Sequence, residues 1–216
     1  MDTGQSIAIG LSIFLGVWYV VGAIINRRRG VATYHWLRAG LEQTGKISEA
    51  KWIGSAGSGA RLVVGNPGKP FRRIEVVFLL ESREIMPLWL FNRIRNKQDE
   101  MILKANLRQV PIQEVESAPS GDRKLKGLLS TSGVNLNPFE AVSAPDDFGI
   151  LRRGGQDEER LKALRSFLTK YNNSVFQLSL RRESPHLILR ARIPSLRENP
   201  AEDLLMDLSA LLSPAQ

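Results

Sequence analysis

The feature that most constrains this chain is an uncharged apolar run near its N-terminus. The nineteen residues from Ile7 to Ile25 contain no charged side chain. A helix of about 20 such residues spans the ~30 Å hydrocarbon core of a bilayer, and a single segment satisfies its backbone polar groups there only as a helix. The run therefore predicts a transmembrane helix over residues 7–26, after a short tail of residues 1–6.

Two other interpretations of the run agree less well with its flanks and length. A cleavable secretory signal has a basic start, a shorter apolar stretch and a small-residue cleavage site. Here the only charged side chain before the run is Asp2, and the run is followed by Asn26 and three arginines. A core helix of a soluble protein would carry a polar face, which this run lacks. The membrane span is the interpretation that we favour.

The flanking charges predict how the span is oriented. Every basic residue lies after position 26, and Arg27, Arg28 and Arg29 stand directly at the end of the apolar run. Because Lys and Arg accumulate on the cytoplasmic side, we expect the N-terminus outside and the C-terminal part on the cytoplasmic side. Trp18 and Tyr19 lie slightly past the middle of the run, so we expect them to pack against another helix or lipid.

The rest of the chain alternates between helical and strand patterns. Strands come in groups with helices between them, which favours an α+β fold with a largely antiparallel sheet. Helices are predicted at residues 31–43, 157–171 and 201–212. Strands are predicted at residues 47–53, 60–64, 71–80, 101–108, 140–143, 175–182 and 187–193.

These patterns divide the chain beyond the span into four parts. Residues 117–135 are rich in turn-forming residues and predict a loop or linker. The parts are a basic juxtamembrane helix (27–45), a β-rich membrane-proximal part (46–116), this loop or linker (117–135) and an α+β C-terminal part (136–216).

Composition excludes several kinds of site. The chain has no Cys and only two His, which excludes disulfides, thiolate metal sites and cysteine nucleophiles and leaves almost no basis for a histidine metal site. The glycine-rich segment 54–59 lacks the Lys-Ser/Thr ending of a phosphate-binding loop and precedes a predicted strand, so it predicts a hairpin turn. His35 and His186 have no partner at catalytic spacing and are expected to be structural or solvated. We predict no catalytic, cofactor or metal residues.

The segment Met86–Lys97, MPLWLFNRIRNK, combines large apolar side chains with basic ones. Interfacial membrane segments have this composition, since apolar groups enter the headgroup boundary and basic groups meet anionic lipid. The alternative is a short core helix that begins at Pro87. Together with the three arginines after the span, the residues expected at the membrane interface are Trp89, Phe91, Arg93, Arg95 and Lys97.

The positive charge is concentrated close to the predicted membrane. Residues 27–116 hold 16 basic and 9 acidic side chains, against 14 and 12 in residues 117–216. A nucleic-acid binder would gather its charge on one face with a recognisable motif, and no such motif is present, so no nucleic-acid partner is expected. Arg181, Arg190 and Arg192 fall on the polar face of a predicted hairpin, where a solvated face is the default and an anion site the alternative.

These observations predict a single-pass membrane protein that acts by binding. Expected partners are the lipid bilayer, anionic lipid headgroups and another membrane protein, for which the chain would serve as a scaffold, assembly factor or accessory subunit. The alternative is a membrane-tethered enzyme whose site uses Ser, Asp, Glu or Arg in an arrangement that a single sequence does not reveal.

Overall fold

The structure is a computed structural model that describes residues 2–131, 138–145 and 147–213. Its helices are α1 (Thr3–Thr44), α2 (Met86–Ile94), α3 (Arg123–Thr131), α4 (Glu158–Lys170), α5 (Ile193–Leu196) and α6 (Ala201–Leu212). Its strands are β1 (Ile47–Trp52), β2 (Gly59–Gly65), β3 (Phe71–Leu79), β4 (Glu100–Leu107), β5 (Gln113–Pro119), β6 (Glu140–Val142), β7 (Phe148–Gly154), β8 (Val175–Leu180) and β9 (Leu187–Arg192).

Within the described residues the nine strands form one sheet in the order β1-β2-β3-β4-β9-β8-β5-β7-β6. Every neighbouring pair in this order is antiparallel. The predicted α+β fold with an antiparallel sheet is confirmed, and the sheet joins the membrane-proximal and C-terminal parts of the chain.

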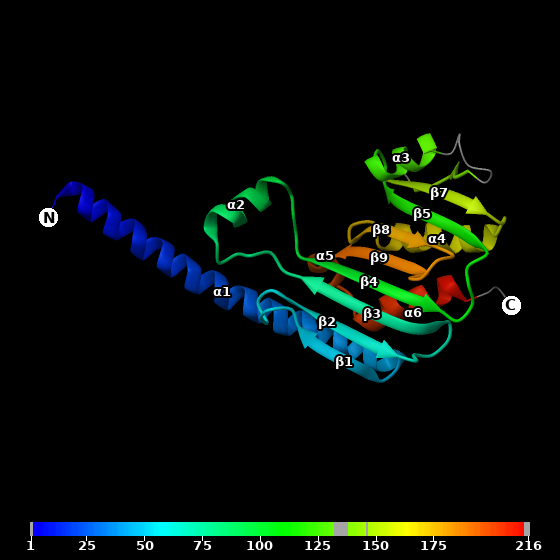
Figure 1. Cartoon of the computed structure of the whole chain (residues 1–216), viewed down its shortest axis with the longest axis horizontal. Helices are drawn as coiled ribbons and strands as arrows, with labels where there is room; N and C mark the ends of the chain where they lie inside the picture. Colours follow the sequence, from blue (N-terminus) through cyan, green and yellow to red (C-terminus); the bar gives the residue numbers. More distant parts are fainter. Residues whose placement is uncertain (1, 132–137, 146, 214–216) are drawn as a thin grey trace.

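Helix α1 is a single helix of 42 residues, about 63 Å long at 1.5 Å per residue. The sequence pattern predicts a transmembrane helix and a separate juxtamembrane helix, but the structure has no break between them. No proline occurs within α1 to interrupt its hydrogen-bond ladder. Figure 1 shows its first half projecting away from the sheet and its second half lying against it.

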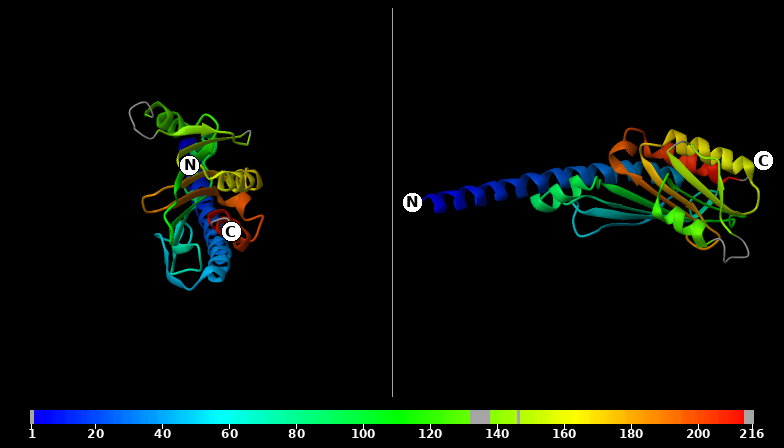
Figure 2. Two further views of the ribbon diagram at one scale, coloured as in Figure 1. Left: turned by 90° about the vertical axis from the view of Figure 1, so that its right-hand side faces the viewer. Right: turned by 90° about the horizontal axis from the view of Figure 1, so that it is seen from above.

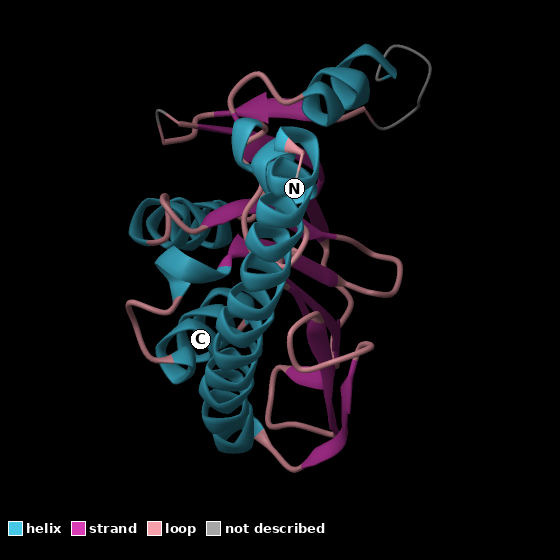
Figure 3. Ribbon diagram, turned by 90° about the vertical axis from the view of Figure 1, so that its left-hand side faces the viewer, coloured by secondary structure: helices cyan, strands magenta, loops and turns pink. Residues whose placement is uncertain are grey.

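The helices cover the two faces of the sheet unequally. The second half of α1 lies with α4 and α6 on one face, and α3 lies on the other (Figures 2 and 3). Leu37 and Leu41 of α1 belong to the same buried core as Leu204 and Leu208 of α6. The second half of α1 is therefore part of the folded domain, because its removal would expose this core.

The strand patterns explain which face is buried. In β4, Met101, Leu103, Ala105 and Leu107 are buried in the core, as the alternation predicts. Side chains point alternately to opposite faces of a strand, so the polar residues of β4 lie on the face away from α4 and α6. The same alternation is confirmed in the hairpin of β8 and β9, whose leucines are buried.

The prediction of a loop over residues 117–135 is wrong for its first part, which contains the end of β5 and helix α3. Strand β5 is hard to recognise because it lies inside the sheet yet buries polar residues, including Glu114 and Glu116. Helix α3 is stabilised by Leu125, which packs with Ala118 of β5 and Leu151 of β7. The remaining residues 132–135 lie outside the described residues.

Candidate functional site

Two loops and one aspartate lie against one side of α1 at the end of its apolar run. We call the loops of residues 53–58 and 80–85, together with Asp99, the collar. On the side of α1 that faces the collar, Gly22, Asn26 and Gly30 are buried at intervals of four residues. Residues four apart lie on one face of a helix, so these three form a continuous stripe under the collar.

The two glycines allow the collar backbone to approach the helix closely. A Cβ atom added at Gly22 would lie 2.6 Å from the carbonyl oxygen of Arg83. One added at Gly30 would overlap the carbonyl oxygen of Ala56 in the turn between β1 and β2. The predicted hairpin turn is confirmed, and the structure shows that it also packs on α1.

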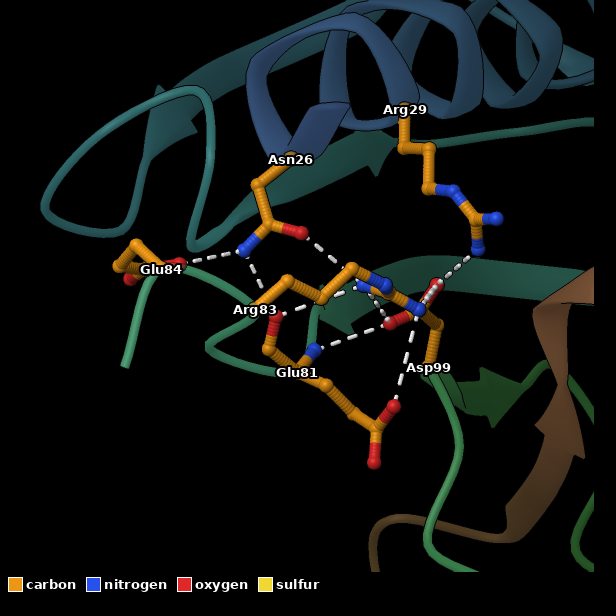
Figure 4. Close-up of polar contacts among 6 residues, drawn as sticks. All are labelled: Asn26, Arg29, Glu81, Arg83, Glu84 and Asp99. Atoms are coloured by element: carbon orange, nitrogen blue, oxygen red, sulfur yellow. Dashed lines mark hydrogen bonds and ion pairs between the residues drawn. The ribbon is translucent and has the colours of Figure 1, made fainter. Parts of the chain in front are cut away.

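Asn26 links α1 to the second loop through its side-chain amide. Its Nδ2 donates to the carbonyl oxygen of Glu81 and to Oε2 of Glu84, both at 2.7 Å, and its Oδ1 accepts from Nη1 of Arg83 at 3.0 Å (Figure 4). A buried amide is stable only when its hydrogen-bonding groups have partners. The collar supplies these partners.

Asp99 is the charged centre of the collar and is only 3% exposed. Arg83 binds it in a bidentate manner, with both nitrogen–oxygen distances at 2.9 Å, and the backbone N–H of Glu81 donates to Oδ1 at 2.9 Å. Nη1 of Arg29 lies 3.5 Å from Oδ2 (Figure 4). Bidentate charge-assisted pairs are strong and fix orientation, so Arg83 and its loop are held against Asp99, and Arg29 connects this pair to the helix.

Glu81 is the least satisfied carboxylate of this cluster. Its Oε2 lies 3.6 Å from Nη2 of Arg83, whereas its buried Oε1 has no hydrogen-bond partner in the part of the chain that the structure describes. Burial raises the pKa of the Glu81 carboxyl above its usual range; the guanidinium of Arg83 opposes this rise and the carboxylate of Asp99 adds to it. The collar thus holds one carboxyl group with an increased preference for its proton.

The residues predicted for the membrane interface fall into separate groups. Arg27, Arg28 and Arg29 are all exposed, and the side chain of Arg29 also points toward Asp99 (Figure 4). Of the other predicted residues, Trp89, Phe91 and Arg93 belong to helix α2, and Arg95 and Lys97 follow it. The structure describes no buried residue in α2. The alternative of a core helix in this segment is therefore wrong.

Trp89 of α2 contacts the apolar run of α1. Its ring centroid lies 5.4 Å from that of Trp18, and Nε1 of Trp18 donates to the carbonyl oxygen of Arg83 at 3.0 Å. Trp18 therefore packs against another helix, one of the two environments that its position predicts. Phe91 is exposed instead, with the guanidinium of Arg95 4.2 Å from its ring centroid.

The three arginines of the predicted anion face have different surroundings. Arg181 pairs with the buried Glu116 through Nη2 at 2.8 Å, and Arg190 pairs with Glu100 through Nε at 2.6 Å. Arg192 is exposed beside an open hollow of about 660 Å³ on the face of the sheet that carries α3. Two of the three cations thus already have carboxylate partners within the chain.

Most of the collar was not recognised from the sequence. Asn26 and Glu84 are 58 positions apart and Arg83 and Asp99 are 16 apart, so no local motif connects them. One available signal was the interval of four between Gly22, Asn26 and Gly30. This interval places one glycine on each side of a polar residue along one helical face.

No protein-family model matches this chain, and no curated protein matches it. Among the described residues no group of three or more His, Cys, Asp or Glu side chains could hold a metal ion. The collar's contacts instead connect an apolar helix to a folded domain.

Replacing Gly30 with Ala should destabilise the protein, because the new methyl group would displace the backbone at Ala56. Overpacking of this kind costs about 1–3 kcal/mol, so we expect the full chain in detergent micelles to melt at a lower temperature. Gly16→Ala is the matched control, since a Cβ at Gly16 has no neighbour within 4 Å. Equal losses in both variants would show that the close approach at Gly30 contributes nothing.

Replacing Glu81 with Gln should raise the melting temperature at neutral pH. A carboxyl whose pKa is raised by folding binds its proton more tightly in the folded state, so its contribution to stability declines as the pH rises from below the unfolded pKa through the folded one. Gln does not ionise, so the difference in melting temperature between the variant and the wild type should become smaller as the pH falls toward about 4.

Glu75→Gln supplies a control of opposite sign for this experiment. Hydrogen bonding to Arg61 lowers the pKa of Glu75, and this carboxylate stabilises the fold above its unfolded pKa and loses that effect as the pH falls. Glu75→Gln should therefore melt at a lower temperature than the wild type at neutral pH. A Glu81→Gln variant that behaves in the same way would contradict the effect assigned to burial.

Proposed function

We propose that this chain is a single-pass membrane protein that holds an α+β binding domain at a fixed position on the membrane surface, as a scaffold, assembly or accessory subunit of a membrane complex. The observation that carries the proposal is the continuity of α1. Its first half is long and apolar enough to cross a membrane and is almost entirely exposed in the isolated chain. Its second half lies in the core of the domain.

This continuity supports a positioning role because it leaves no flexible linker between anchor and domain. A disordered linker would let a domain sample many heights and orientations, whereas a continuous helix fixes both. The collar adds restraint where the apolar half of α1 meets the domain, through Asn26, Arg83 and Asp99. A protein that only needed to be near a membrane would not require this rigidity.

The orientation that we propose places the sheet domain on the cytoplasmic side. Arg27 and Arg28 are exposed just beyond the apolar run, where basic residues are retained in the cytoplasm. Arg29 follows them in the sequence, and its guanidinium group also pairs with the carboxylate of Asp99. All three positive charges belong to the first turn of the helix after the span.

Protease added to sealed, right-side-out vesicles should leave the domain intact, because the membrane would separate the protease from the domain. The measurement is the size of the protected fragment on a gel, with detergent-opened vesicles as the positive control. Digestion of the domain in the sealed vesicles would show that the orientation is the opposite of the one proposed.

A positioning subunit should co-purify in mild detergent with another membrane protein at a fixed molar ratio. The measurement is the composition of the complex after size-exclusion chromatography. A chain whose residues 7–17 are replaced by leucine keeps an apolar span, Trp18 and the collar, and it shows whether the partner contacts the span or the domain. Migration of the full chain alone, without a stoichiometric partner, would contradict the scaffold role.

A further inference from the structure

Helix α2 presents an apolar surface that the rest of the chain leaves uncovered. Leu88, Leu90, Phe91 and Ile94 are exposed, and Ile94 is 74% exposed. Figure 1 shows α2 beside the middle of α1, away from the sheet and on the side of the domain from which the apolar half of α1 projects. Such a cluster of large apolar side chains is unusual for a water-facing surface.

The contact between Trp18 and Trp89 fixes the level of α2 along α1. Trp18 precedes Ile25, the last residue of the apolar run, by seven positions. At 1.5 Å per residue the Trp18 ring lies about 10 Å inside the end of that run. Interfacial helices bury their apolar face about 5–10 Å into the boundary between headgroups and acyl chains, so α2 stands at the depth of such a helix.

We infer that α2 is immersed in the cytoplasmic leaflet of the bilayer, as a second membrane contact whose depth is set by the Trp18–Trp89 contact. This inference rests on the proposed span. It changes the role expected for Trp89: its ring packs on α1, whereas Leu88, Leu90 and Phe91 enter the lipid. The protein then contacts the membrane at two places, which fixes its rotation about α1 as well as its height.

The charges at the end of α2 agree with this placement. Arg93, Arg95 and Lys97 are all exposed; Arg93 directly precedes Ile94, and Arg95 and Lys97 follow it. The guanidinium of Arg95 lies over the Phe91 ring, so its apolar stem and its charge lie at the boundary of the apolar surface. Long basic side chains at such a boundary extend toward phosphate groups while their stems stay in apolar surroundings.

A bilayer explains the surface better than a protein partner does, because the span brings lipid to it. If the apolar run crosses the membrane, acyl chains surround α1 at the level of Trp18. Trp89, which contacts Trp18, must then border the same acyl chains. A protein partner would first have to displace that lipid.

The absence of native cysteine allows a direct test with the full chain. Single variants Leu90→Cys and Ile94→Cys would carry a nitroxide spin label in nanodiscs of phosphatidylcholine and phosphatidylglycerol. The readout is the collision rate of the label with oxygen, which partitions into lipid, relative to that with a water-soluble nickel chelate. Ile13→Cys in the span and Val110→Cys on the domain, both at exposed positions, are the lipid and water references.

We expect the oxygen-to-nickel ratio at both α2 positions to be several-fold above that of Val110→Cys and to approach that of Ile13→Cys. Values equal to Val110→Cys, with Ile13→Cys in lipid, would overturn the immersion of α2 and leave the span intact. A water-like Ile13→Cys would overturn the span itself. Water-like α2 labels in lipid nanodiscs that become protected in native membranes would assign the surface to a protein partner and overturn the inference.

Discussion

The structure depends on one helix whose two halves have different surroundings. In its first half α1 is exposed and apolar, and in its second half it contributes Leu37 and Leu41 to the core of the folded domain. An uninterrupted helix satisfies its own backbone hydrogen bonds along its whole length. The domain therefore cannot tilt or rotate relative to the apolar half of α1 without bending this helix or breaking the contacts beside it.

The collar stabilises the transition between the two halves of α1. Glycines at 22 and 30 bring loop backbone against the helix, and Asn26 is hydrogen-bonded between them. Burying Asp99 is costly unless it is paired, and Arg83 together with backbone N–H donation supplies that pairing. The arrangement is specific because each buried side-chain nitrogen or oxygen atom of the collar has a defined partner, except Oε1 of Glu81, the carboxyl whose pKa is raised.

The position of α2 follows from the same geometry. It is inserted between β3 and β4, which are neighbours in the sheet, and the chain leaves the end of β3 and returns to the start of β4 on the side nearest the apolar half of α1 (Figure 1). The excursion carries Trp89 to the level of Trp18. Its composition would be unfavourable in water, and the span that we propose would place it at the boundary of a bilayer, which it suits.

Most elements with a local sequence pattern could be predicted from the sequence alone, although strand β7 was not. The uncharged run predicts an apolar helix, alternation in β4 identifies its buried face, and the acidic start of α4, whose cap Asp157 accepts a hydrogen bond from the N–H of Arg160, marks the beginning of that helix. Other features depend on contacts between segments that are distant in the sequence. Strand β5 was missed because Glu116 is polar yet buried among Lys124, Ser179 and Arg181, and the collar was missed because its members are distant in sequence. The physical reason is the same in both cases: a polar residue can be buried only where partners from other segments meet it, and periodicity carries no information about those partners.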